Sequence, residues 1–389
     1  MQEEKQLVPQ LRFSEFEGEW IMKKFRKIVD INPKNKELPN SFIYIDLESV
    51  NNGNLLKEER IFKVDAPSRA QRLLSKKDIL YQTVRPYQKN NYFFDKAEND
   101  YVASTGYAQI RTSNNSTSFL YQYIHTNYFV NKVLLRCTGT SYPAINSTDL
   151  SKIKVATPLL SEQQKIANFL TAIDKRIHTL EKKKTLLEQY KKGVMQKIFK
   201  QELRFKDDTS TTPSASDGKA FPEWEEKKLG EVCSKKSSNI SANKIGENFG
   251  EYIIYGASGV LKKVDFYKEE NDYVSIIKDG AGVGRIVYCK GKSSVLGTME
   301  IIKPNSKLNT YFLYCLLENV NFKKYITGST IPHIYFKDYK KEKCNIPPLE
   351  EQTKIANFLS AIDISVELVT KKIEHTKTFK KGLLQQMFV

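Results

Sequence analysis

The sequence predicts a mixed α/β protein in which two globular α/β domains are separated by two long, antiparallel, coiled-coil-like helices. Three observations predict this fold class. A stretch of fifteen residues occurs twice. Each copy is followed by apolar residues spaced as in a coiled coil. The remaining sequence contains short strand-like runs bounded by Gly- and Asn-rich turns. The chain has 389 residues, which is enough for two or three domains.

The repeat is the most informative of these features. Residues 160–174 read LSEQQKIANFLTAID and residues 349–363 read LEEQTKIANFLSAID, with twelve identical positions at a constant offset of 189 residues. The matches continue downstream to the pairs Lys192-Gly193 and Lys381-Gly382. This period is longer than that of a solenoid repeat, so one module of about 190 residues is used twice.

Each copy of the repeat begins a long helix, predicted over 158–205 and 347–389. Ser161 is the expected N-cap of the first helix, whereas the second follows Pro347-Pro348. Apolar residues recur in alternating steps of three and four, which is the 3.5-residue seam of a coiled coil. The seam residues are Ile166, Leu170, Ile173, Ile177, Leu180, Leu187, Val194 and Ile198 in the first helix, and Ile355, Leu359, Ile362, Val366, Val369, Ile373, Leu383 and Met387 in the second.

Such a narrow stripe has to be covered, and the other helix is the cheapest partner. The two helices would then form an antiparallel pair about a pseudo-two-fold axis. The alternative is that each helix packs only on its own globular domain. The globular domains are expected over 1–157 and 221–346, and the polar segment 206–220 is expected to be a flexible linker.

The charge and the cysteine pattern limit the class of protein. Lys and Arg exceed Asp and Glu by 17, which favours a polyanionic partner such as nucleic acid. No apolar run has the length of a membrane span, and the first ten residues are polar. The five cysteines are scattered without a CxxC pair. We therefore expect a cytoplasmic protein without a disulfide framework or structural zinc.

Catalytic motifs are missing from the sequence. It has no GxxxxGK[ST] stretch, and the glycine-rich segment Asp279–Arg285 lacks GxGxxG spacing. The four histidines are too scattered to predict a metal site. We expect no catalytic residue, no metal and no cofactor in this chain.

Two divergent domains alternating with two near-identical helices resemble the specificity subunit of a type I restriction–modification system, over essentially the whole chain. The resemblance is carried by the two fifteen-residue stretches with their trailing Lys-Gly pairs. Further motifs support it: Leu-Arg-Phe at Leu11 and Leu203, Trp20 and Trp224, Lys77 to Leu80 with Val84 to Pro86, and Gly328 to His333.

The resemblance implies a non-catalytic DNA-reading subunit. Domains 1–157 and 221–346 would be target-recognition domains, each reading one half of an asymmetric bipartite site in double-stranded DNA. The helices would set the spacing and dock two adenine-methylating methyltransferase subunits, and restriction/translocase subunits would complete the assembly. S-adenosylmethionine, ATP and Mg would belong to those partners. The expected location is the bacterial cytoplasm, at the nucleoid through DNA, with no membrane partner.

Candidate DNA-binding residues are basic, amide or aromatic side chains in expected loops. Arg reads guanine and Asn or Gln reads adenine in the major groove, whereas phosphate contact or simple exposure is the alternative for each residue. The candidates are Arg69, Gln71, Arg72, Arg85, Tyr87, Gln88, Lys89, Tyr107 and Arg111 in the first domain, and Lys262, Lys263, Lys278, Arg285, Lys292, His333 and Tyr335 in the second.

Four polar residues outside the seam recur in both helices. They form either a docking surface presented twice, for two copies of one partner, or residues that only solvate and cap the helix starts. They are Glu162, Lys165, Asn168 and Asp174, repeated as Glu351, Lys354, Asn357 and Asp363.

Two other functions stay open at this point. One is a stand-alone DNA-modifying enzyme, which would transfer methyl groups without partners. The other is a coiled-coil scaffold with incidental basic charge, which would bind no defined DNA.

Overall fold

The computed structural model describes residues 6–34, 37–98, 100–207 and 219–389. The chain folds as two compact units. Unit 1 comprises Met1–Glu181 and Lys371–Val389, and unit 2 comprises Lys182–Thr370. Most of the expected linker, residues 208–218, lies outside the described residues.

Unit 1 contains two four-stranded sheets and two two-stranded ones. The sheets have the orders β6-β3-β10-β7, β2-β11-β8-β9, β1-β12 and β4-β5. The strands are β1 Ile21–Lys24, β2 Asp30–Ile31, β3 Ser41–Ile45, β4 Val50–Asn51, β5 Asn54–Leu55, β6 Arg60–Phe62, β7 Ala70–Leu73, β8 Asp78–Gln82, β9 Tyr92–Phe94, β10 Tyr101–Ser104, β11 Tyr107–Arg111 and β12 Lys154–Thr157. The shorter helices are α1 Thr117–Tyr123, α2 Asn127–Leu134 and α3 Ser147–Lys152, with 3-10 turns η1 Phe25–Lys27, η2 Lys63–Asp65 and η3 Pro86–Gln88.

Unit 2 repeats this plan with different lengths. Its sheets have the orders β16-β22-β19-β20, β18-β17-β21, β15-β23 and β13-β14. The strands are β13 Lys206–Asp207, β14 Lys219–Ala220, β15 Glu225–Lys228, β16 Cys233–Ser237, β17 Tyr252–Gly256, β18 Gly259–Val264, β19 Tyr273–Ile277, β20 Ile286–Cys289, β21 Ser293–Val295, β22 Met299–Pro304 and β23 Lys343–Ile346. The shorter helices are α5 Leu229–Val232, α6 Thr310–Glu318 and α7 Phe336–Tyr339, with 3-10 turns η4 Ala242–Ile245 and η5 Phe322–Tyr325.

The common plan has three parts. A two-stranded antiparallel ladder, β1-β12 or β15-β23, leads into a long helix. A four-stranded antiparallel sheet carries the main core. A further sheet contains one parallel pair, β3 with β10 or β17 with β21. This arrangement confirms the predicted mixed α/β class.

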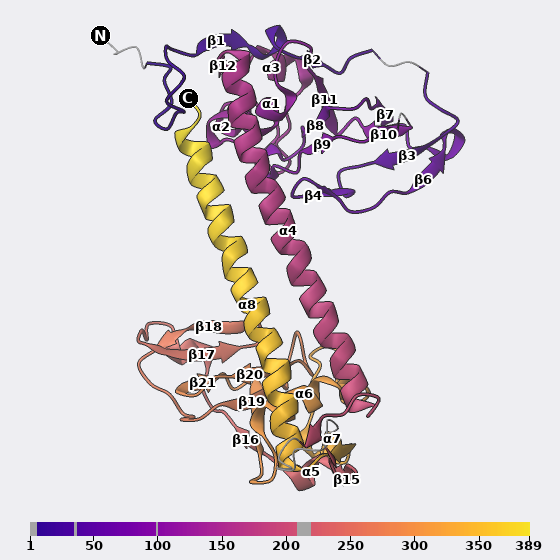
Figure 1. Cartoon of the computed structure of the whole chain (residues 1–389), viewed down its shortest axis with the longest axis vertical. Helices are drawn as coiled ribbons and strands as arrows, with labels where there is room; N and C mark the ends of the chain where they lie inside the picture. The colour runs from indigo at the N-terminus through magenta and orange to yellow at the C-terminus, as the bar shows by residue number, and fades with distance from the viewer. Residues whose placement is uncertain (1–5, 35–36, 99, 208–218) are drawn as a thin grey trace. The chain divides into compact units, whose positions relative to one another are not determined.

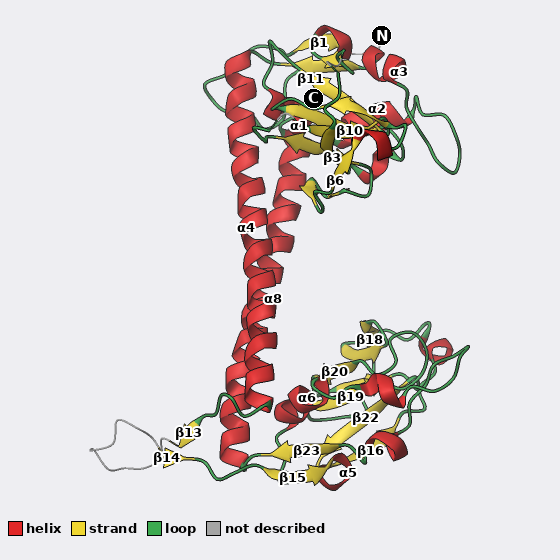
Figure 2. Cartoon of the chain, turned by 90° about the vertical axis from the view of Figure 1, so that its right-hand side faces the viewer, coloured by secondary structure: helices red, strands yellow, loops and turns green. Residues whose placement is uncertain are grey.

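The two long helices are α4, Leu160–Phe199, and α8, Leu349–Gln386. In each unit they lie side by side and run in opposite directions (Figures 1 and 2). The amide of Gln163 donates to the carbonyl of Leu159, so α4 begins before Ser161. Ser161 therefore lies in the first turn and is not the N-cap that the sequence predicted.

The predicted seam residues face the interior of each unit. Leu170 in unit 1 and Leu359 in unit 2 are both fully buried. Leu180, Leu187, Val194 and Val366 are half-buried, and the remaining predicted seam residues are buried. The first half of α4 and the end of α8 pack into the core of unit 1, next to Trp20. The end of α4 and the first half of α8 pack into the core of unit 2, next to Trp224. Both packing arrangements considered for the seam therefore occur together, because each helix pairs with the other and also packs on a globular domain.

Candidate nucleic-acid interface

A buried arginine–glutamate–tryptophan cluster fixes the start of α4 in unit 1. Arg12 donates from Nε and Nη2 to the two carboxylate oxygens of Glu162 at 2.8 and 2.7 Å. Trp20 Nε1 donates to the same carboxylate at 3.3 Å. The hydrogen bond to Glu162 raises the pKa of Arg12. Two parallel charge-assisted bonds fix both partners in one geometry.

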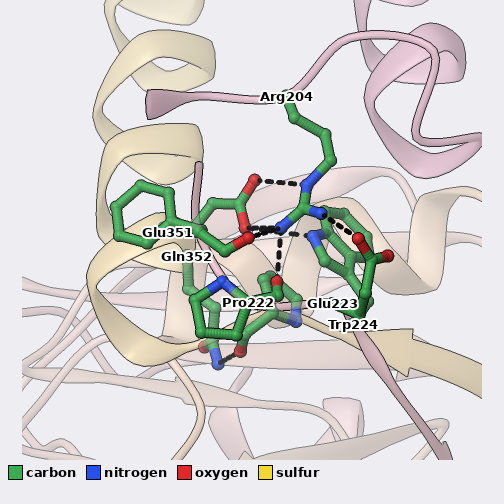
Figure 3. A network of polar contacts seen from close by, with 8 residues as sticks. Arg204, Pro222, Glu223, Trp224, Glu351 and Gln352 are labelled. Atoms are coloured by element: carbon green, nitrogen blue, oxygen red, sulfur yellow. Dashed lines mark hydrogen bonds and ion pairs between the residues drawn. The ribbon is translucent and has the colours of Figure 1, made fainter. Parts of the chain in front are cut away.

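Unit 2 builds the same cluster from the second copy of the sequence (Figure 3). Arg204 donates to the carboxylate of Glu351 at 3.3 and 2.9 Å, and Trp224 Nε1 donates to it at 3.1 Å. Arg204 also donates to the carbonyl of Pro222 at 2.5 Å, which ties down the chain leading to Trp224. The segment before each globular domain is thereby anchored to the helix that follows that domain.

This cluster corrects the docking prediction for two residues. Glu162 and Glu351 are 2% and 0% exposed, and their carboxylates face arginine and tryptophan inside the chain. They are structural and unavailable to a partner. The reason is that a carboxylate can be buried when a guanidinium fork reaches it, and those arginines lie about 150 positions away in the sequence.

The aspartates of the docking prediction hold the two helices together. In unit 1, Lys380 of α8 contacts Asp174 of α4 at 2.6 Å. In unit 2, Lys191 of α4 contacts Asp363 of α8 at 2.6 Å. Each lysine interrupts the apolar seam, and each aspartate accepts a further hydrogen bond, from Gln122 or from the hydroxyl of Tyr311. Both aspartates therefore have intrachain roles.

The other four predicted docking residues have outward positions. Asn168 and Asn357 are exposed. Lys165 pairs with Glu15 at 2.6 Å and keeps half of its side chain exposed. Lys354 donates to the carbonyl of Lys206 at 2.6 Å and is half-buried. Of the predicted docking residues, the two asparagines are therefore the ones that are exposed and could contact a partner at the helix starts.

Each unit contains a loop that is latched by the same backbone hydrogen bonds. In unit 1 the amide of Arg85 donates to the carbonyl of Pro143 at 2.7 Å, and that of Ile145 to Thr83 at 3.0 Å. In unit 2 the amide of Gly280 donates to Pro332 at 2.9 Å, and that of Ile334 to Lys278 at 3.0 Å. The latching segments, 138–144 and 327–333, correspond at the repeat offset and share a Thr-Gly pair and a proline.

The latched loops also share their turn. Arg85 and Lys89 have φ values of 54° and 56°, and Gly280 and Gly284 have 81° and 84° at the matching places. A left-handed backbone is natural for glycine and costs a side-chain-bearing residue about 1–2 kcal/mol. Unit 1 therefore tolerates strain in order to carry two cationic side chains where unit 2 has glycine. We define the two latched loops as 83–89 and 278–285.

The first latched loop carries several predicted DNA-binding residues at its surface. The Arg85 guanidinium lies 4.1 Å from the ring centroid of Tyr142, and Tyr142 is 62% exposed. Tyr87 is 50% exposed. Gln88 accepts a hydrogen bond from Gln82, and Lys89 donates to the carbonyl of His125 at 2.8 Å. The loop brings together three of the candidates, an arginine, a tyrosine and a lysine.

One predicted DNA-binding residue of unit 1, Tyr107, is internal, which corrects the prediction, and another, Arg111, binds a carboxylate of the chain while part of its side chain stays exposed. Tyr107 is 0% exposed and donates its hydroxyl to the carbonyl of Asp46 at 3.3 Å. Arg111 forms a fork on the buried carboxylate of Asp78, at 2.8 and 2.7 Å. Both residues belong to β11, where Tyr107 pairs with β8 and Arg111 pairs with β2, and the Arg111 side chain stays 37% exposed.

The remaining candidates of unit 1 lie around β7. Arg69 and Gln71 are exposed, and Gln71 donates to the carbonyl of Ser68. Arg72 is half-buried, and its Nε atom has no hydrogen-bond partner in the described part of the chain. Burial lowers the pKa of Arg72. A desolvated guanidinium nitrogen without an acceptor is costly, so an external acceptor would stabilise it.

The candidates of unit 2 split into two groups. Lys278, Arg285, His333 and Tyr335 lie on or beside the second latched loop, and Arg285 Nη1 donates to the carbonyl of Ala257 at 3.1 Å. Tyr335 is 49% exposed. Lys262 and Lys263 belong to β18 and Lys292 directly precedes β21, the two strands that flank β17. Lys262 donates to the carbonyls of Ile245 and Gly246. Lys292 approaches Glu270 at 4.0 Å.

An exposed aromatic pair escaped the sequence reasoning. Tyr190 of α4 and Phe379 of α8 stand at the repeat offset and are 53% and 57% exposed. Their signal in the sequence is an aromatic residue outside the seam in both copies.

Among the described helices, none combines the length and the apolarity that crossing a membrane requires.

The comparison with known proteins gives one family. The model of the type I restriction modification DNA specificity domain matches residues 19–189 and 222–377. The chain is 28% identical over 256 residues to the putative type I restriction enzyme MjaX specificity subunit of Methanocaldococcus jannaschii, covering 62% of this chain and 60% of that protein. It is 26% identical over 276 residues to the MjaVIII specificity subunit of the same organism, covering 63% and 64%.

Solved structures share the fold. The S subunit of a type I restriction-modification system from M. genitalium superposes with a TM-score of 0.67 at 17% identity, covering 98% of this chain and 99% of that one. A further structure, of a type I R-M system, gives 0.54 at 21% identity, covering 95% and 97%. Because the family model matches both copies of the repeat and most of the sequence, the chain belongs to the family of the type I restriction modification DNA specificity domain.

Proposed function

We propose that the chain is the DNA-reading specificity subunit of a type I restriction–modification complex, in which each unit reads one half of an asymmetric bipartite site. The observation that carries the proposal is the pair of latched loops. One backbone arrangement presents Arg85 and Tyr87 in unit 1 but a glycine-rich turn with Arg285 in unit 2. A frame used twice with different exposed side chains is what two different half-sites require.

The unpartnered arginine atoms support contact with nucleic acid. Nε of Arg72 and Nε of Arg85 are buried and have no hydrogen-bond partner among the described residues. Phosphate oxygens and the acceptor edge of guanine are the groups that arginine binds in DNA complexes. The net charge of +17 adds a general attraction that falls as salt rises.

The long helices would set the distance between the half-sites and dock two methyltransferase subunits. Support comes from the doubled outer surface, with Asn168 and Tyr190 on α4 repeated as Asn357 and Phe379 on α8. Exposed aromatic side chains are favoured at protein interfaces. A surface that occurs twice fits two copies of one partner.

The chemistry would belong to the partners. S-adenosylmethionine would bind to the methyltransferase subunits, which would methylate adenine. ATP and Mg would serve restriction/translocase subunits in the bacterial cytoplasm. This chain would contribute recognition and no catalytic group, which distinguishes it from a stand-alone DNA-modifying enzyme.

The test is to express the chain with its methyltransferase partner and sequence the methylated adenines. We expect one bipartite motif with a fixed unread gap, and no methylation when the chain is omitted. Methyl transfer by the isolated chain would favour the enzyme alternative. Absence of any defined motif, with both proteins folded, would leave the scaffold alternative in its place.

Single-unit variants sharpen this test. Arg72→Ala removes a half-buried cation from unit 1, and Arg285→Ala removes an exposed one from unit 2. We expect each variant to weaken binding through one half-site only, by about 1–3 kcal/mol if the arginine reads a base. The readout is affinity for duplexes in which either half-site is scrambled. Equal loss on both half-sites would contradict separate reading.

Docking has its own readout. Tyr190→Ala and Phe379→Ala each remove one copy of the exposed aromatic pair. We expect each single variant to retain one methyltransferase subunit and the double variant to retain none, measured by native mass spectrometry. Full occupancy in the double variant would remove these residues from the interface.

A further inference from the structure

A cationic pocket of unit 1 has no assigned role. It has a volume of about 180 Å³ and lies where the end of the first latched loop meets the last turns of α8. Its polar lining consists of Lys89, His125, Asn127, Lys377, Lys380, Lys381 and Gln385. Four lysines converge on one cavity, which is unusual because like charges repel at this range.

Two of the four lysines are neutralised within the chain. Lys380 pairs with Asp174 at 2.6 Å, and Lys377 pairs with Glu181 at 2.6 Å. These two ion pairs join α8 to α4. They therefore account for the helix contact and leave the remaining charge of the pocket to Lys89 and Lys381.

The other two lysines have no carboxylate partner in the described part of the chain. Lys89 donates to the carbonyl of His125 at 2.8 Å and to Oδ1 of Asn127 at 3.0 Å, and both acceptors are neutral. The side chain of Lys381 forms no ion pair or hydrogen bond within the described ranges. Burial lowers the pKa of Lys89, and the nearby Lys381 lowers it further. The pocket holds two uncompensated cations side by side.

His125, which also lines the pocket, neither balances the positive charge of the lysines nor adds to it. Its Nδ1 donates to the carbonyl of Tyr121 at 2.6 Å, and its Nε2 faces the amide of Asn91 at 3.3 Å. Burial lowers the pKa of His125 to about 4, so the ring is neutral at pH 7. An external anion is the simplest group that would balance Lys89 and Lys381.

Unit 2 lacks this charge at the corresponding place. Lys89 corresponds to Gly284 in the latched turn, and Lys377 corresponds to Glu188 at the repeat offset. Lys191, which corresponds to Lys380, pairs with Asp363 and lies 5.4 Å from the ring centroid of Tyr314. The lysine cluster is therefore a property of one copy and not of the repeated frame.

We propose that this pocket binds one phosphate group of the DNA backbone beside the half-site read by unit 1. The inference rests on the proposed function. Lys89 connects the pocket directly to the first latched loop, so a strand contacted by Arg85 would pass it. The cavity has room for a tetrahedral phosphate, given that a water takes about 30 Å³. The contact would exist on one side of the bipartite site only.

Lys381→Gln and Lys192→Gln form the matched pair that tests the proposal. They are the same residue of the repeat, each just before a glycine, and both are exposed on long helices. The full chain is titrated with the duplex defined by the methylation motif, at several salt concentrations. For Lys381→Gln we expect the slope of log affinity against log salt to shrink by about 0.9, and the affinity at ~0.1 M salt to fall roughly eightfold. For Lys192→Gln we expect less than half of either change.

Replacing single phosphates by neutral methylphosphonates locates the contact. Wild type should lose affinity at one position beside the first half-site, and Lys381→Gln should be indifferent to that replacement. An unchanged salt slope in a folded Lys381→Gln variant would overturn the pocket while leaving DNA reading intact. If the wild type does not bind the bipartite duplex in preference to other DNA, the proposed function itself is wrong, whatever the result for the pocket.

Inorganic phosphate distinguishes a DNA phosphate from a free anion. Under the proposal, millimolar phosphate competes weakly with DNA in wild type and not in Lys381→Gln. A different result would contradict the proposal: phosphate raises the melting temperature of wild type but not of Lys381→Gln, and both proteins have the same slope of log DNA affinity against log salt. The pocket would then bind a small anion and not a phosphate of the DNA backbone.

Discussion

Unit 1 and unit 2 are similar where they face their own interiors and different where they face solvent. The Arg-Glu-Trp cluster, the lysine–aspartate pair between α4 and α8 and the backbone latch occur in both. The side chains on the latched loops and the charge of the lysine pocket occur in one unit only. The repeated residues build a frame, and the divergent residues distinguish one half of the chain from the other.

The first way to break this comparison is to remove the arginine of the repeated cluster. Arg12→Ala leaves the carboxylate of Glu162 buried without its cation, and Arg204→Ala does the same to Glu351. Each variant should destabilise its own unit by about 3–5 kcal/mol. Hydrogen exchange measured by mass spectrometry should show faster exchange in the affected unit.

A second substitution controls for lost packing. Adding Glu162→Gln to Arg12→Ala removes the unpaired charge, so it should restore part of the lost stability. If the double variant is no better than Arg12→Ala, charge burial is not the cause. If Arg12→Ala loosens both units equally, the clusters do not act separately.

The second test concerns the seam. Leu170→Ala and Leu359→Ala remove matching side chains that are fully buried. Each should cost about 2–5 kcal/mol through lost burial and the cavity left behind. Denaturant unfolding, followed unit by unit with hydrogen exchange, gives the loss. Alanine at the matched exposed positions Lys175 and Ile364 should cost below about 0.5 kcal/mol, and a comparable cost there would disprove the seam.

The third and smallest effect is a pH dependence of unit 1 alone. His125 has a folded pKa of about 4, below its ordinary value of 6.5, because burial disfavours the charged ring. Below pH 6.5 the unfolded chain takes up a proton that the folded chain refuses, so stability falls as the pH falls. The loss attributable to His125 should reach about 2 kcal/mol at pH 5.

His125→Gln provides the comparison for that effect. Its unit 1 should lose less stability between pH 7 and pH 5 than unit 1 of the wild type. Unit 2 has Tyr314 at the repeat offset, and it should behave alike in both proteins. An identical pH profile for unit 1 in variant and wild type would show that His125 titrates normally.

The local sequence pattern predicted the long helices and their seam correctly, but it did not predict which polar residues are buried. The 3.5-residue spacing placed the seam because apolar periodicity is a property of the helix itself. The exposed face was misjudged at Glu162 and Glu351, since the arginines that bury them belong to a distant segment. One signal was present: Leu-Arg-Phe and a following Trp occur once in each copy of the repeat, and they recur together with the repeated glutamate.

For the DNA-binding candidates, too, the sequence gives the residue type but not the contacts that the side chain makes. Residue type alone could not separate Arg111, which holds Asp78, from Arg85, which lies against an exposed tyrosine. Arginine serves both purposes with the same fork of donors. Tertiary packing decided the difference, because it buries Tyr107 and brings the buried carboxylate of Asp78 within reach of Arg111.

The sequence by itself determined the repeat, the two long helices with their apolar seams, the mixed α/β class and the family resemblance, because these depend on periodicity and on identity at a fixed offset. Only the tertiary structure decided which carboxylates are buried, which loops are latched and where four lysines converge. Those features depend on contacts between segments up to about 290 positions apart, such as Lys89 and Lys381, and no local pattern encodes such contacts.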